Sequence, residues 1–116
     1  MIKQFIAGSC YSYILSSENE ALIIDPHISL PDEYRKYLTK NKLTLKFIVD
    51  THTHADHFSS AAVLKKQFNA QVLMHEKAIS TVADKRLKDN DRINIGTTNI
   101  KVIYTAGYDA TNGVLN

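Results

Sequence analysis

Apolar residues in this chain occur in short runs that polar turns separate. Three such runs stand near the N-terminus, over residues 2–6, 11–15 and 21–24. Asp25-Pro26 ends the third run, because proline has no N–H to donate to a further ladder bond. Each run is far shorter than the roughly 20 residues that a helix needs to cross a bilayer. The pattern therefore predicts short strands and no membrane partner.

Strands and helices alternate in the rest of the chain. The expected elements are a helix over residues 30–38, a strand over 45–49, a helix over 61–68, a strand over 71–74, a short helix over 76–82, and a hairpin of 92–96 with 99–103. Pro31 suits the first turn of the first helix, with Ser29 or Asp32 as its cap. We expect Lys85–Lys88 to be a solvated loop. Strands followed by strand–helix alternation predict an α/β (α+β) fold, with a mixed sheet and flanking helices.

Composition limits the classes of function. The chain has 116 residues, of which 44% are hydrophobic and 22% charged, and a net charge of +2. These values predict one folded domain and argue against a nucleic-acid binder, which would carry a concentrated basic face. The lone cysteine, Cys10, excludes an internal disulfide and is expected to be a small buried hydrophobe. The N-terminus lacks the pattern of a signal peptide, so we expect a cytoplasmic protein.

The chemistry is concentrated after the run at 45–49. Three of the five histidines and one carboxylate, His52, His54, Asp56 and His57, lie within six positions. Imidazole and carboxylate are the usual ligands of zinc and of non-haem iron. The alternative is a polar surface loop in which Asp56 caps the following helix, but chance is a poor explanation for such a cluster. The segment therefore predicts a metal site.

The order of residues in this segment resembles that of a known family. The sequence Thr51-His52-Thr53-His54-Ala55-Asp56-His57 after an apolar strand resembles the metal-binding signature of the metallo-β-lactamase fold superfamily. The stretches 10–15, 21–26 and 90–96 are similar to the persulfide dioxygenase and glyoxalase II (hydroxyacylglutathione hydrolase) branch. The resemblance implies the N-terminal half of the family's αββα sandwich, with residues 1–116 forming a single truncated domain.

The resemblance also implies an activity and its residues. It implies one or two zinc or iron ions held by His52, His54, Asp56 and His57, with Asp56 as the catalytic residue that orients a hydroxide. The substrate would be a small molecule, either a glutathione-type thioester for a hydrolase or a persulfide for a dioxygenase. In the family an aspartate at the place of Asp25 supports the metal loop; the alternative for Asp25 is a turn former, and both readings stay open.

Two departures from the family pattern lower the expected activity. At the place of the family's third histidine the chain has Tyr108, which we expect near the site, and a phenol must lose a proton to bind a metal well. The chain stops at Asn116, before the late aspartate and histidine of the family. We therefore expect impaired turnover, or alternatively a non-catalytic metal-binding or oligomerising paralogue. Half a sandwich leaves an apolar face exposed, which predicts a homo-oligomer.

Overall fold

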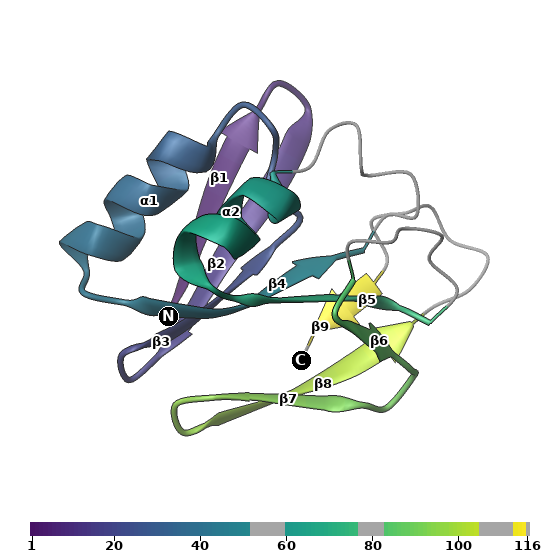
Figure 1. Ribbon diagram of the computed structural model, residues 1–116. Coiled ribbons are helices and arrows are strands. Elements are labelled where there is room, and N and C mark those ends of the chain that lie inside the picture. Colours follow the sequence, from purple (N-terminus) through teal and green to yellow (C-terminus); the bar gives the residue numbers. More distant parts are fainter. Residues whose placement is uncertain (52–59, 77–82, 105–112, 116) are drawn as a thin grey trace.

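A mixed six-stranded sheet forms the centre of the molecule in the computed structural model, which describes residues 1–51, 60–76, 83–104 and 113–115. The strands follow one another in chain order, as β1 (Ile2–Ala7), β2 (Cys10–Ser17), β3 (Glu20–Ile24), β4 (Thr44–Asp50), β5 (Gln71–His75) and β6 (Lys85–Leu87). The first three strands pair antiparallel, and β3 to β6 pair parallel (Figure 1). The predicted mixed sheet is confirmed.

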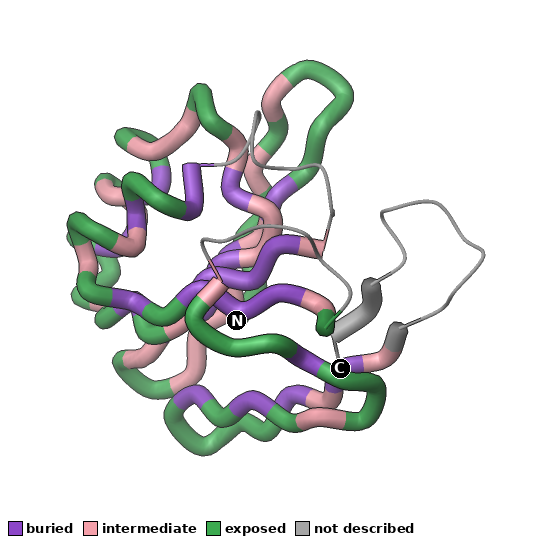
Figure 2. The backbone as a smooth tube through the Cα atoms, turned by 45° about the vertical axis from the view of Figure 1, so that its right-hand side comes forward, coloured by how far each residue is buried: buried purple, intermediate pink, exposed green. Residues whose placement is uncertain are grey.

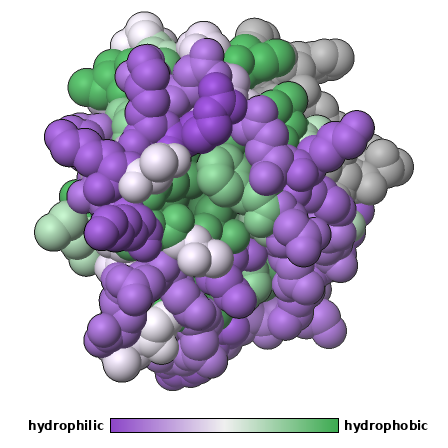
Figure 3. Space-filling view, turned by 60° about the vertical axis from the view of Figure 1, so that its left-hand side comes forward, coloured by the Kyte–Doolittle hydropathy of each residue, from purple (hydrophilic) through white to green (hydrophobic). Residues whose placement is uncertain are grey.

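Two helices cover one face of this sheet, α1 (Pro31–Lys40) and α2 (Ala61–Phe68) (Figure 1). Tyr34 and Leu38 of α1 and Leu64 of α2 are buried in one core cluster with Ile14 and Ile48 of the sheet. Apolar side chains at spacings of three and four give each helix this buried side. On the face of the molecule shown in Figure 3, apolar side chains form a continuous central area with hydrophilic side chains around it.

The start of α1 is partly as predicted. Pro31 lies in the first turn, where its missing N–H costs nothing. The predicted cap was wrong, because Leu30 is the N-cap residue and no side chain caps the helix. Asp32 instead forms an ion pair with Arg35, one turn further along the helix.

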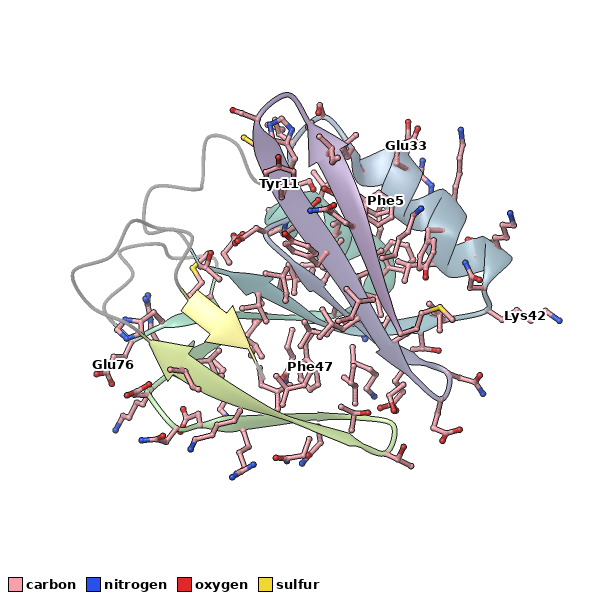
Figure 4. The ribbon with its side chains drawn as sticks, turned by 180° about the vertical axis from the view of Figure 1, so that it is seen from behind. Phe5, Tyr11, Glu33, Lys42, Phe47 and Glu76 are labelled. Atoms are coloured by element: carbon pink, nitrogen blue, oxygen red, sulfur yellow. The ribbon has the colours of Figure 1, made fainter. Side chains whose placement is uncertain are left out.

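A second sheet of three antiparallel strands packs on the opposite face of the first (Figure 1). Its strands are β7 (Arg92–Ile95), β8 (Thr98–Tyr104) and β9 (Gly113–Leu115). Burial alternates along β7 (Figure 2), so that Ile93 and Ile95 pack against Leu22 and Val49. Phe47 lies between the two sheets (Figure 4). The layers are thus helices, sheet and sheet, which matches the N-terminal portion of the predicted sandwich.

Polar contacts fix the β7–β8 hairpin to the first sheet. The Gly96 N–H donates to the carboxylate of Glu20 at 2.8 Å, and the Thr97 N–H donates to Ser17 Oγ at 3.1 Å. Gly96 has a positive φ of 53°, and a Cβ at this position would lie 2.3 Å from the Ser17 carbonyl oxygen. Only glycine therefore fits between this hairpin and the end of β2.

Two local predictions were wrong. Residues 85–87, expected in a solvated loop, form β6 beside β5, and Leu87 is 3% exposed. Leu87 belongs to the second core cluster. Its three basic neighbours made the segment look solvent-exposed in the sequence. Cys10 is exposed rather than buried, because it begins β2 next to the tight turn at Gly8. The short helix predicted over 76–82 lies largely outside the described residues.

Within the described part of the chain, no helix is both long and apolar enough to cross a membrane.

Candidate functional site

The strand ends at one edge of the six-stranded sheet define the candidate site. The parallel strands β3, β4 and β5 end at Ile24, Asp50 and His75. Asp50 pairs with Met74 on β5, and Ile24 pairs with Val49 on β4, so these three ends lie side by side. In sheets of this kind, ligands bind outside the carboxyl ends of parallel strands. The His-rich segment begins two residues after Asp50 and so leaves the sheet at this edge.

Most of the predicted site residues fall outside the described part of the chain. These are His52, His54, Asp56, His57 and Tyr108. Their convergence around a metal therefore stays a prediction. The residues that flank the His-rich segment, Thr51 and Ser60, are described, and so is Asp25.

Asp25 is hydrogen-bonded to the residue that precedes His52. Its Oδ1 accepts from the Thr51 backbone N–H at 2.7 Å, and its Oδ2 accepts from Thr51 Oγ1 at 2.6 Å. The Asp25 N–H donates to the Val49 carbonyl at 2.8 Å. Asp25 has a positive φ of 53°, a conformation that aspartate tolerates better than most residues. Asp25 thus forms the turn after β3 and also holds Thr51, the residue before His52; its support of metal ligands stays a prediction.

The other end of the segment is bound to the same turn. The Ser60 N–H donates to the Pro26 carbonyl at 3.0 Å. Ser60 is 1% exposed and is the N-cap residue of α2. Asp56, the alternative cap, lies outside the described residues. Its Oγ is buried and has no hydrogen-bond partner among the described residues. Consecutive residues of one turn therefore contact both described flanks of the segment.

A buried hydroxyl contacts the third residue of that turn. The Tyr34 Oη accepts from the His27 N–H at 2.8 Å and lies 2.7 Å from Ser12 Oγ, where either hydroxyl can donate. Tyr34 and Ser12 are both buried. Burial raises the pKa of the Tyr34 hydroxyl above its ordinary value, and the nearby Asp25 charge adds to the rise, so Tyr34 stays protonated at neutral pH. The sequence analysis did not single out Tyr34 and gave no signal for this network.

Asp50 is a second residue that the sequence analysis did not single out. It is 3% exposed at the end of β4 and takes part in an interaction within the protein. A buried carboxylate requires compensating partners, and such groups concentrate at functional sites. The available signal was an aspartate at the end of an apolar strand, directly before the histidines.

The donor set of the segment fits a divalent metal. Three imidazoles and one carboxylate are the ligand types that zinc and iron bind. Among the residues that the structure describes, no group of three or more His, Cys, Asp or Glu side chains is arranged to hold a metal ion. The ligand candidates are therefore those of the sequence, and the structure contributes the anchoring of their flanks.

A mixed sheet with helices on one face and a second sheet on the other defines a class of layered α/β sandwich. Residues 6–109 match the metallo-beta-lactamase superfamily, and the chain belongs to this family. The predicted family and fold are thereby confirmed.

Individual relatives cover the chain well but extend beyond it. A hydroxyacylglutathione hydrolase of Francisella tularensis subsp. novicida is 35% identical over 99 residues, which are 84% of this chain and 38% of the relative. The structure of ETHE1 from Myxococcus xanthus matches with a TM-score of 0.80 and 25% identity, over 88% of this chain and 47% of that one. A Staphylococcus aureus metallo-beta-lactamase structure matches with a TM-score of 0.80 and 26% identity, over 99% of this chain and 36% of that one. The chain thus spans about 38% of the length of its curated relative.

Proposed function

We propose that this chain is the metal-binding portion of a metal-dependent hydrolase of thioesters, similar to hydroxyacylglutathione hydrolase. His52, His54, Asp56 and His57 would hold one or two divalent ions, zinc or iron, and Asp56 would also act as the catalytic residue. The 35% identity to a hydroxyacylglutathione hydrolase favours this substrate class.

The observation that carries this proposal is the double hydrogen bond from Thr51 to the Asp25 carboxylate. Groups that support metal ligands from behind restrict the ligands' orientation and raise metal affinity. Asp25 restricts the backbone one residue before His52, at the strand end where the family binds metal. A turn former alone would need no carboxylate aimed at the neighbouring strand.

The metal would supply a nucleophile by lowering the pKa of a bound water towards about 7. The chain's own residues would do the rest. Asp56 would accept a hydrogen bond from that water and so orient it. Asp25 and Pro26 would hold the two flanks of the segment, which keeps the entropy lost on metal binding small.

A sulfur dioxygenase acting on a glutathione-type persulfide is the second candidate. The residues of the His-rich segment favour this candidate, because Thr-His-Thr-His-Ala-Asp-His resembles the persulfide dioxygenase branch more than typical glyoxalase II. Such an enzyme would use iron with His52, and His54, Asp56 and His57 would support it. Tyr108 at the position of a ligand lowers the expected activity of either kind, and a non-catalytic metal-binding paralogue is the remaining alternative.

Metal analysis tests the site itself. The purified chain, supplemented with zinc or iron and then freed of excess metal, should retain near-stoichiometric metal. His52→Ala and His57→Ala should each lose it, whereas Glu33→Ala, at an exposed carboxylate of α1, should retain it. No retention by the unaltered chain after supplementation would contradict the proposal.

Parallel assays with a glutathione thioester and glutathione persulfide separate the two activities. Thioester hydrolysis that depends on zinc supports the first candidate, and oxygen uptake that depends on iron supports the second. Stoichiometric metal binding without either activity would favour the alternative that the protein is a non-catalytic metal-binding paralogue.

We further propose that two or more copies associate in the cytoplasm. The contact surface would be the part of the first sheet, at β1 and β2, that the second sheet leaves uncovered. Ile2, Ile6 and Tyr11 are 68%, 60% and 54% exposed, and the β1–β2 register places them on the face that the second sheet covers elsewhere. Exposed apolar side chains grouped in this way favour association. Light scattering should show an oligomer that Ile6→Lys dissociates, and a monomer at all concentrations would contradict this.

A further inference from the structure

The turn of Asp25, Pro26 and His27, called here the 25–27 turn, is contacted by residues from three separate parts of the chain. Its three residues bind, in order, Thr51 after β4, Ser60 at the start of α2, and Tyr34 of α1. Tyr34 in turn contacts Ser12 of β2. Each contact lies between 2.6 and 3.0 Å. The turn is therefore the point at which the helix layer is connected to both flanks of the His-rich segment.

Tyr34 is the residue through which α1 joins this network. Tyr34 is 0% exposed, and its ring makes an edge-to-face contact with Phe5 at 5.0 Å between centroids. Phe5 lies beside α1 (Figure 4). The ring is thus fixed by apolar packing on α1, while the hydroxyl reaches the backbone of the turn. A buried hydroxyl in a core otherwise filled by apolar side chains requires partners, and here they are Ser12 and His27.

We propose that the Tyr34 hydroxyl is a positioning group for metal binding, which fixes the 25–27 turn and through it the Thr51 and Ser60 flanks of the His-rich segment. This inference rests on the proposed metal site and adds a residue of α1 whose described contact is with the 25–27 turn. Removing the hydroxyl leaves the half-buried His27 N–H and the buried Ser12 Oγ without this partner. The turn can then recover these bonds only by moving, which moves the groups that hold Thr51 and Ser60.

The chain offers a matched control on the same helix. Tyr37 also makes an edge-to-face contact with Phe5, at 5.7 Å, but its hydroxyl lies at the surface near Met1 Sδ. Tyr34→Phe and Tyr37→Phe therefore remove the same atom from the same aromatic cluster. Only the first removes a contact to the 25–27 turn.

The first measurement is amide hydrogen exchange of the metal-free chain. Tyr34→Phe should speed exchange of the Thr51 N–H, which donates to Asp25, by roughly tenfold relative to the unaltered chain. Tyr37→Phe should leave it unchanged. Equal protection of Thr51 in both variants would overturn the inference whether or not the chain binds metal.

The second measurement is affinity for Zn²⁺ in competition with a chelator, together with the visible absorption of the Co²⁺-loaded chain. Tyr34→Phe should weaken Zn²⁺ binding by roughly tenfold and shift the Co²⁺ bands, because the ligands are held less closely. Tyr37→Phe should change neither. Metal binding by the unaltered chain with equal affinity in both variants overturns this inference alone, whereas no binding by the unaltered chain overturns the proposed function.

Ser12→Ala guards against a variant that does not fold. It removes the other hydroxyl of the pair and keeps the Tyr34 ring and its bond to His27. If Tyr34→Phe unfolds, Ser12→Ala should still speed Thr51 exchange, by roughly threefold, since one of the two contacts of the Tyr34 hydroxyl is lost. Unchanged exchange in a folded Ser12→Ala would then overturn the inference.

Discussion

The Asp25 carboxylate and Thr51 form two hydrogen bonds with each other, although 26 residues separate them in the chain. Both oxygens of the carboxylate are used, one by the Thr51 N–H and one by its hydroxyl. The pair joins the ends of the adjacent parallel strands β3 and β4 at the edge of the sheet from which the His-rich segment departs. This pair makes the segment's start a fixed point of the fold.

We expect Asp25→Asn to weaken Zn²⁺ binding by roughly 10–100-fold, the range seen when a group supporting metal ligands is changed. The two Thr51 donors bind different carboxylate oxygens, and the amide of asparagine would place an NH₂ donor where one of these acceptors is now. Chelator competition measures the affinity. Asp32→Asn, at an exposed aspartate of α1 paired with Arg35, is the matched control and should bind as the unaltered chain does.

Thr51→Val should have a smaller effect than Asp25→Asn. The substitution removes the Oγ1 bond but keeps the backbone bond to Asp25, so a loss of roughly threefold to tenfold in Zn²⁺ affinity is expected. Thr51→Ser should restore the affinity, and Thr39→Val on the exposed side of α1 should not change it. An effect of Thr51→Val as large as that of Asp25→Asn would mean that the hydroxyl, rather than the backbone bond, dominates.

Tyr108→His should raise metal affinity by roughly tenfold or more at pH 7. The reason is that a phenol has a pKa of about 10 and must lose its proton to bind a cation, whereas a neutral imidazole is the main form at this pH. Tyr108→Phe should leave affinity unchanged or slightly lower. Unchanged affinity of the histidine variant would show that position 108 does not face the metal.

Gly96→Ala should destabilise the protein by about 2–3 kcal/mol, measured by urea unfolding. The new Cβ would meet the Ser17 backbone, and φ is positive at this position. Gly8→Ala is the control, since φ is also positive there but no atom lies within 4 Å, and it should cost only about 1 kcal/mol. Equal losses would mean that the hairpin can move away from β2 at no cost.

We expect the protein to lose stability in acid as Asp84 becomes protonated. Its carboxylate accepts hydrogen bonds from Lys65 of α2 and from the Val72 N–H of β5, and these hold the pKa of Asp84 below its ordinary value of 3.8. Because the folded state favours the charged form, this contribution is complete above the ordinary value and is lost as pH falls below it. The difference in unfolding free energy between the unaltered chain and Asp84→Asn should therefore shrink as pH falls below about 4. A difference that stays constant from pH 7 to pH 3 would contradict this origin.

Much of the fold could be predicted because its signals are local. The apolar run at 45–49 is long and β-rich enough to indicate β4, and the spacing of Ala61, Leu64 and Phe68 indicates α2. The prediction for residues 85–87 failed because their strand is defined by one buried side chain, Leu87, and by pairing with β5. A three-residue strand has too few positions for alternation to be visible.

The sequence by itself determined the family of this protein and predicted the ligand types of its metal site, since a cluster of three imidazoles and one carboxylate can be recognised without coordinates. Tertiary structure alone decided how the flanks of that cluster are held. Asp25 meets Thr51 and Tyr34 meets His27 and Ser12 because parallel pairing and helix packing bring distant positions within hydrogen-bond distance. Such contacts depend on the register between elements and on the direction of each side chain, and neither is written in the order of the residues around them.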